Sequence, residues 1–312
     1  MLDLSLTLAA DGPNPLGHVL DVPNVLGPFS MHVVTLVLAA VLTILTMMKV
    51  AKAMEEGSEA DGAGRYIPKG KLAQIIEFLC STLRDKVVKP QLGDSTDKFM
   101  PFLWTLFFFI LFNNMLGLIP LLDLQHVIGG VGWGDKHWAI VGGTATGNLA
   151  VTAGLATIAF FVIQINGIRS SGFGGWANHF LGGAPVWLAP VIVPVEILGM
   201  IIKPSALAIR LCANMVGGHT LLATVLMFTG MSIGAIGWLA GAPVAILSML
   251  GGIAIYFLEI FVGALQAFIF MFLTTIFIAQ LMHHHHDDHE GAHDYGHDQV
   301  PESQDLAVPV TQ

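Results

Sequence analysis

Two long apolar runs in the second half of the sequence limit its possible folds most strongly. Residues 188–228 form one run of 41 residues, and residues 243–282 form another of 40. At about 1.5 Å rise per residue, each would be roughly 60 Å long as a helix, twice the thickness of the hydrocarbon core of a bilayer. Neither run contains a convincing polar turn, although each is long enough for two spans. We therefore expect two strongly tilted membrane helices that fold as a hairpin around residues 229–242.

The composition supports a membrane protein with several spans rather than a soluble globule. Of the 312 residues, 54% are hydrophobic and 11% are charged, and the mean hydropathy is +0.72. The predicted fold class is an all-α polytopic membrane protein with about five membrane-embedded helices. Outside the hairpin, the sequence predicts spans at 31–48, 99–122 and 145–165, and loops at 55–70, 123–145 and 166–187.

Residues 71–90 predict an amphipathic helix between the first two spans. Apolar side chains recur there at helical spacing among charged ones, at Leu72, Ile75, Ile76, Leu79, Leu83 and Val87. Such a stripe is typical of a helix that lies on the membrane surface. A soluble helix packed against another subunit is the alternative.

The placement of charge predicts three segments and an orientation. Nine of the thirteen Lys and Arg residues lie between Lys49 and Lys98, so this part is expected in the cytoplasm. Residues 1–30 then form an extracytoplasmic segment, 31–282 the membrane domain, and 283–312 a cytoplasmic tail rich in His and Asp. This tail holds seven of the thirteen histidines, and we expect a solvated tail rather than a metal-binding one. We expect no metal site and no cofactor. We also expect no nucleic-acid partner, because no basic patch with interleaved aromatic residues occurs.

Polar residues inside the first long run have a regular spacing. Glu196, Lys203 and Arg210 are spaced by seven, so they fall near one face of a helix, and Asn214 lies four residues further on. A charged side chain at the centre of a bilayer costs at least ~2.5–3.5 kcal/mol, so a membrane helix that keeps one usually uses it. Arg210 is therefore the first candidate functional residue.

The second long run contains Glu259 and Gln266, which are also seven residues apart. Residues that face each other in an antiparallel pair have residue numbers with a constant sum. Arg210 and Gln266 add up to 476, and His219 and Glu259 to 478, so one hairpin register fits both pairs. A permanent cation beside a protonatable His–Glu pair favours ion translocation with an electrostatic gate. The structural alternative is that Arg210 only ties helices together, through backbone carbonyls or Glu196.

Four stretches of the sequence resemble a known family. KPSALAIRLCANMVGGH (203–219) and ALQAFIFMFLTTIFIA (264–279) are similar to the two signature helices of the F-type ATP synthase a subunit. LFNNMLGLIP (111–120) and TATGN (144–148) resemble its earlier spans, and the resemblance covers roughly residues 70–282. It implies an ion-translocating membrane stator subunit that is not catalytic alone, in a cell inner membrane. The implied partners are a ring of c subunits, the b subunits of the peripheral stalk, the rest of the F0F1 complex, lipid and the translocated H⁺. Whether H⁺ or Na⁺ drives the complex is left open.

The resemblance also implies roles for single residues. Arg210 matches the essential arginine that keeps the ring carboxylate ionised and blocks proton leakage between two aqueous half-channels. Asn214 and Gln266 match its polar neighbours. His219 and Glu259 match the pair of the outer half-channel, and Glu196 an acidic residue on the cytoplasmic side.

Two departures from the family pattern stand out. His219 and Glu259 are exchanged relative to many bacterial members, and the arrangement is that of mitochondrial members. Gly117 stands near a position where some members carry an acid, for which Asp123 is a weak substitute.

Two other functions remain as alternatives. One is a secondary anion transporter with Arg210 as a substrate ligand, although no internal repeat of the kind found in many transporters is evident. The other is a membrane anchor that conducts no ion, which would not need His219 and Glu259 in register.

Overall fold

The structure, a computed structural model, describes residues 30–53, 70–119, 144–181 and 185–283. These residues contain helices and no strand. Five helical stretches are long and apolar enough to cross a membrane: Met31–Ala53, Lys71–Leu118, Leu149–Arg169, Ala189–Val225 and Gly241–Met282. The predicted all-α polytopic class is thereby confirmed. The predicted N-terminal segment and C-terminal tail, and most of the loops at 55–70 and 123–145, lie outside the described residues.

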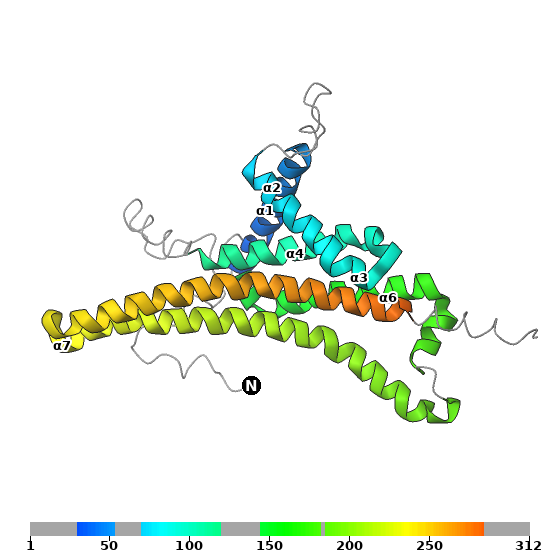
Figure 1. Ribbon diagram of the computed structural model, residues 1–312. Helices are drawn as coiled ribbons and strands as arrows, with labels where there is room; N and C mark the ends of the chain where they lie inside the picture. The colour runs from blue at the N-terminus through cyan, green and yellow to red at the C-terminus, as the bar shows by residue number, and fades with distance from the viewer. Residues whose placement is uncertain (1–29, 54–69, 120–143, 182–184, 284–312) are drawn as a thin grey trace, which may run out of the picture.

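The hairpin predicted from the two apolar runs is α7 (Ala189–His283), which is broken at Gly237. Gly237 has φ 78° and ψ 167°, a backbone conformation essentially reserved for glycine. The chain reverses there, inside the turn expected at 229–242, and Figure 1 shows the two halves running side by side before they diverge. We call residues 189–236 the first arm and residues 238–283 the second arm.

The other helices are α1 (Met31–Ala53), α2 (Lys71–Thr82), a π-helical turn at Leu83–Val88, α3 (Lys89–Leu92), α4 (Thr96–Leu118) and α6 (Leu149–His179). Of these, α3, α4 and α6 pack against the hairpin, whereas α1 packs mainly against α4 and α2 (Figure 1). A short 3₁₀ turn, η4 (Ala145–Gly147), precedes α6. The most extensive contacts of α7 are with α6 and α4.

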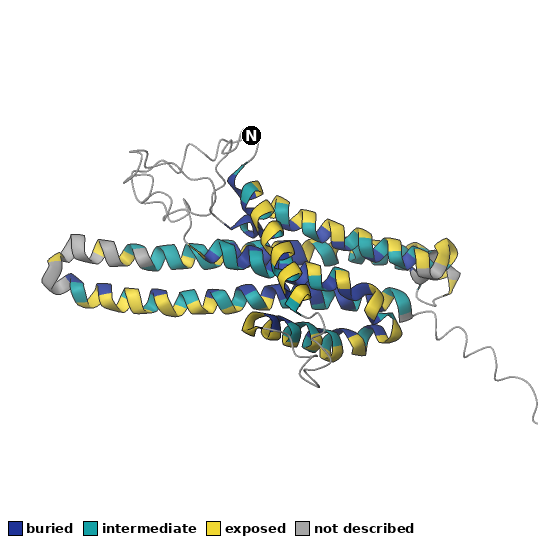
Figure 2. Cartoon of the chain, turned by 90° about the horizontal axis from the view of Figure 1, so that it is seen from above, coloured by how far each residue is buried: buried dark blue, intermediate teal, exposed yellow. Residues whose placement is uncertain are grey.

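The core lies where α4 and α6 meet both arms. Phe108 and Ile110 of α4 and Phe270 and Met271 of the second arm are fully buried there. Figure 2 shows buried residues concentrated where the helices cross, and exposed ones along the outer side of α7. Many of these exposed residues are large and apolar, as expected of a surface in contact with lipid or with other subunits.

The structure corrects one prediction from the sequence. The stretch 166–187, expected to be a loop because of its many glycines, is helical as far as His179. A single break at Gly172 (φ 68°) changes the helix direction, so glycine serves here as a kink rather than as loop material. The helix predicted at 71–90 is present as α2, the π-helical turn and α3. Ile76 and Leu83 of its apolar stripe are buried against the bundle, whereas Leu72 and Ile75 are exposed.

Candidate functional site

His219 of the first arm and Glu259 of the second arm are in contact within the bundle. The distance from His219 Nδ1 to Glu259 Oε1 is 3.5 Å, and the Glu259 side chain is only 3% exposed. A glycine beside His219 allows this approach, because a Cβ at Gly218 would lie 2.6 Å from Glu259 Oε1. The structure thus brings together the His–Glu pair that the hairpin register predicts.

The second ring nitrogen of His219 is hydrogen-bonded to Thr144. His219 Nε2 pairs with Thr144 Oγ1, and this threonine is buried just before η4. The imidazole therefore bridges a carboxyl group of the second arm and a hydroxyl group of the turn before α6. The TATGN stretch indicated the family, but the sequence gave no reason to place this hydroxyl beside His219.

A second series of hydrogen bonds holds η4 against α4. The Thr146 hydroxyl donates to Asn114 Oδ1 at 2.8 Å, and the Asn114 amide nitrogen donates to the backbone oxygen of Gly263 at 2.9 Å. Thr146 and Asn114 are both fully buried. This series of hydrogen bonds links the turn, α4 and the second arm, and so fixes the wall of the His219 site.

Gln266 pairs with Asn214, which corrects the expected contact between Gln266 and Arg210. The Asn214 amide nitrogen donates to Gln266 Oε1 at 2.8 Å. The residue numbers of this pair add up to 480, so the arms are offset slightly from the sum of 476 expected for Arg210 and Gln266. Gln266 is almost completely buried, and its amide nitrogen has no hydrogen-bond partner in the described part of the chain.

Arg210 lies on an exposed face of the first arm. It has no hydrogen bond or ion pair with any residue that the structure describes. The exposed residues at helical spacing around it are small: Ala206, Ala213 and Gly217. A guanidinium group that stays charged is therefore presented outward on a face that another helix can approach closely.

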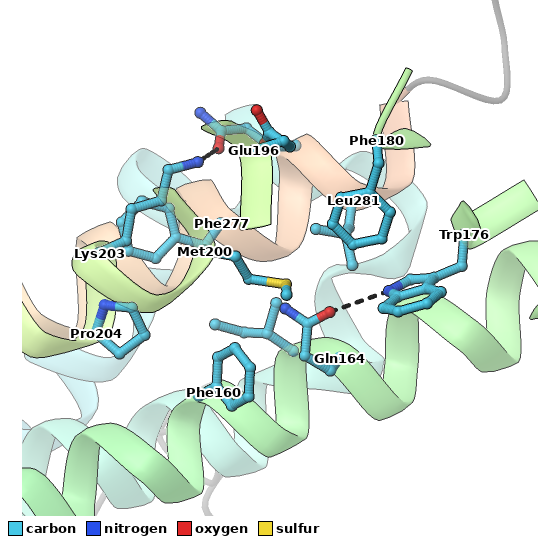
Figure 3. Close-up of a pocket in the computed structure, with 12 residues that line it drawn as sticks. Phe160, Gln164, Trp176, Phe180, Glu196, Met200, Lys203, Pro204, Phe277 and Leu281 are labelled. Atoms are coloured by element: carbon cyan, nitrogen blue, oxygen red, sulfur yellow. Dashed lines mark hydrogen bonds between the residues drawn. The ribbon is translucent and has the colours of Figure 1, made fainter. Parts of the chain in front are cut away.

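Glu196 and Lys203 line a pocket at the other end of the hairpin (Figure 3). The Lys203 ammonium donates to Gln280 Oε1 at 3.4 Å and lies 5.4 Å from the ring centre of Phe277. On the α6 side of the pocket, Trp176 Nε1 donates to Gln164 Oε1 at 3.0 Å. The pocket thus contains an acid, a cation and two amides between α6 and both arms.

Glu196, Lys203 and Arg210 lie on one continuous helical stretch of α7, so they fall near one face as predicted, with a drift of about 20° per seven residues. Arg210 lies further along this stretch and does not line the pocket. The described residues contain no group of three or more side chains that could hold a metal ion. The histidine-rich tail lies outside them.

Comparisons with known proteins match the same family that the four sequence stretches resemble. The family model for the ATP synthase A chain matches residues 29–279. The ATP synthase subunit a of Myxococcus xanthus is 40% identical over 75% of this chain and 67% of its own length. The protein of the same name from Chloroherpeton thalassium is 36% identical over 85% and 69%, respectively. The ATP synthase subunit a of Anaeromyxobacter dehalogenans (strain 2CP-1) is 39% identical over 72% of this chain and 52% of its own length. The chain therefore belongs to the ATP synthase A chain family.

Proposed function

We propose that the chain conducts protons through two half-channels that meet a ring of c subunits at Arg210, and that this flow is coupled to rotation and ATP synthesis. As a family member, the chain is a multi-pass membrane subunit of the F0F1 complex. The observation that carries the finer proposal is the exposed Arg210, which pairs with none of the described residues and lies between two separate polar clusters of the same hairpin.

The two clusters lie on opposite sides of Arg210 along the first arm. His219 is nine residues beyond it and Glu196 fourteen residues before it, or about 13 Å and 21 Å along a helix. We assign the His219–Glu259 pair to the outer half-channel and the Glu196 pocket to the cytoplasmic one. This assignment follows the orientation indicated by the Lys and Arg distribution, with the N-terminus outside and the C-terminus in the cytoplasm.

Arg210 supplies the electrostatic gate. An arginine side chain stays protonated in proteins, so it offers a permanent positive charge to each carboxylate of the passing ring. The charge favours the ionised carboxylate, and it repels a proton that would otherwise cross directly between the half-channels. A cation exposed within a membrane needs an acidic partner, and no described residue forms an ion pair with Arg210.

His219 and Glu259 exchange protons with the outer aqueous side. Histidine changes its charge between pH 5 and 8, and a neighbouring carboxyl group can pass a proton to or from it. Asn214 and Gln266 form the polar surroundings of the arginine on the inner side of the hairpin. The proposed protein partners are the c ring on the Arg210 face and the b subunits of the peripheral stalk. Family membership favours this function over a free-standing anion transporter.

The test is ATP-driven acidification of inverted membrane vesicles that carry the whole complex. Arg210→Ala is expected to abolish acidification, and Arg210→Lys to fail as well, because a desolvated lysine can lose its proton. Arg169→Ala, which removes an exposed arginine at the end of a span, is the matched control and should acidify normally. Acidification by Arg210→Ala vesicles at the wild-type rate would show that the arginine is only structural.

A further inference from the structure

Thr144 lies in the site without a part in the function proposed above. Its hydroxyl pairs with His219 Nε2, on the opposite edge of the imidazole from the nitrogen that faces Glu259. The ring is therefore held between two groups that come from distant parts of the chain. Its orientation depends on both of them.

The backbone around Thr144 keeps its side chain in place. A Cβ at Gly117 would lie 2.6 Å from Thr144 Cγ2, closer than real Cβ atoms approach other atoms. Thr144 therefore fills the space above Gly117 of α4, and the absence of a side chain at 117 is what lets it reach His219. The departure from the family pattern at Gly117 and the position of Thr144 belong to one arrangement.

The turn that follows Thr144 is fastened on two sides. Thr146 donates to Asn114 of α4 at 2.8 Å, and the thiol of Cys212 in the first arm donates to the backbone oxygen of Gly147 at 3.1 Å. A turn held in this way has little freedom to move the Thr144 hydroxyl away from the imidazole. The hydroxyl is thus a fixed partner of His219 rather than an occasional one.

We infer that Thr144 is a positioning residue for His219, whose hydroxyl holds the imidazole so that Nδ1 faces Glu259. The partner of one histidine nitrogen fixes which way the ring and its other nitrogen point. A hydroxyl is both donor and acceptor, so it donates to Nε2 when this nitrogen is bare and accepts from it when it is protonated. Thr144 can therefore keep the ring in place through a complete proton transfer. The inference rests on the proposed function of the His219–Glu259 pair.

Two substitutions separate the hydroxyl from the volume of the side chain. Thr144→Val keeps the shape and removes the hydroxyl, whereas Thr144→Ser keeps the hydroxyl and removes the methyl group next to Gly117. We expect Thr144→Val to slow ATP-driven acidification about three- to tenfold, the effect of one lost hydrogen bond, and Thr144→Ser to stay near the wild-type rate. Thr152→Val is the matched control, because the hydroxyl of this buried threonine donates only to nearby backbone oxygens, those of Leu149 at 3.1 Å and Asn148 at 3.5 Å.

The rates are compared per amount of assembled complex, measured by immunoblot. A purely space-filling role gives the opposite order, with Thr144→Val near wild type and Thr144→Ser impaired, and would overturn the inference.

The pair Thr144→Val and His219→Ala gives a second test. If Thr144 acts through His219, Thr144→Val lowers passive proton conduction no further once His219 is replaced. If Thr144→Val lowers passive proton conduction by the same factor with and without His219, the inference is also overturned. If Arg210→Ala blocks acidification while Thr144→Val does not slow it, only this inference fails, whereas acidification by Arg210→Ala contradicts the proposed function itself.

Discussion

At the scale of single residues, Gly218 sets how closely the two arms approach each other. A methyl group there would press against the Glu259 carboxyl group, which belongs to a side chain that is buried in the bundle. Overpacking of this kind typically costs about 1–3 kcal/mol and pushes the facing side chains apart. We therefore expect Gly218→Ala to separate Glu259 from His219 and to reduce passive proton conduction through F0 by at least about tenfold.

Gly199 provides the control for this substitution. It lies on the same arm, and a Cβ there would meet no atom within 4 Å. Gly199→Ala should leave conduction unchanged when both variants are measured in membrane vesicles stripped of F1. Equal conduction by the two variants would mean that the contact between Gly218 and Glu259 does not control the pair.

The contact that the sequence predicted well is one fixed by helix geometry. The constant sum of residue numbers placed His219 opposite Glu259, and the structure brings these two side chains together, because the rule holds inside one hairpin. The partner of Gln266 was missed, since an offset of a few residues replaces Arg210 by Asn214. Thr144 was missed for another reason. Its place beside His219 depends on how a turn folds back onto α7 across 75 residues of sequence, and no periodicity describes that contact.

At the scale of elements, the turn of α7 depends on one glycine. Gly237 adopts φ 78° and ψ 167°, and forcing another residue into such a conformation costs about 1–3 kcal/mol. Gly237→Ala should therefore weaken the hairpin and lower the temperature at which the detergent-solubilised complex dissociates. The apparent melting temperature from a thermal-shift assay is the measurement.

Gly251 is a matched glycine in the second arm. A Cβ there would lie at an ordinary distance of 3.9 Å from Val225, and alanine is a better helix former than glycine. Gly251→Ala should thus keep or raise the melting temperature. If both variants melt together, the turn does not need a glycine at 237.

The element boundaries show which glycines lie inside helices, a role that the sequence alone did not predict. The many glycines of 166–187 favoured a loop, yet α6 continues through most of them and breaks only at Gly172. In the hairpin, the helix runs through the adjacent Gly217 and Gly218, and Gly218 allows close packing. Composition cannot distinguish these roles, because a glycine serves a kink, a turn or a close approach equally well.

At the scale of the whole molecule, the exposed surface shows which groups of this chain are left for lipid or other subunits to cover. Large apolar side chains such as Phe257, Phe261 and Leu247 are exposed along the second arm, and Arg210 is exposed on the first. A membrane accounts for the apolar groups, but it does not stabilise an unpaired guanidinium group. An acidic partner from another subunit, as proposed above for the c ring, would balance this charge in the plane of the membrane.

The orientation of the bundle decides which cluster faces which side of the membrane. If the region from Lys49 to Lys98 is cytoplasmic, the chain must return to that side at Arg169 and reach the opposite side at Ile119. Single cysteines at exposed positions test this in a background where Cys80 and Cys212 are replaced by serine. Asp94→Cys and Arg169→Cys should react with a membrane-impermeant maleimide in inverted vesicles, and Ile119→Cys only in right-side-out vesicles. The opposite pattern would place the Glu196 pocket on the outer side and the His219–Glu259 pair nearer the cytoplasm, which would reverse the two proposed half-channels while leaving Arg210 between them.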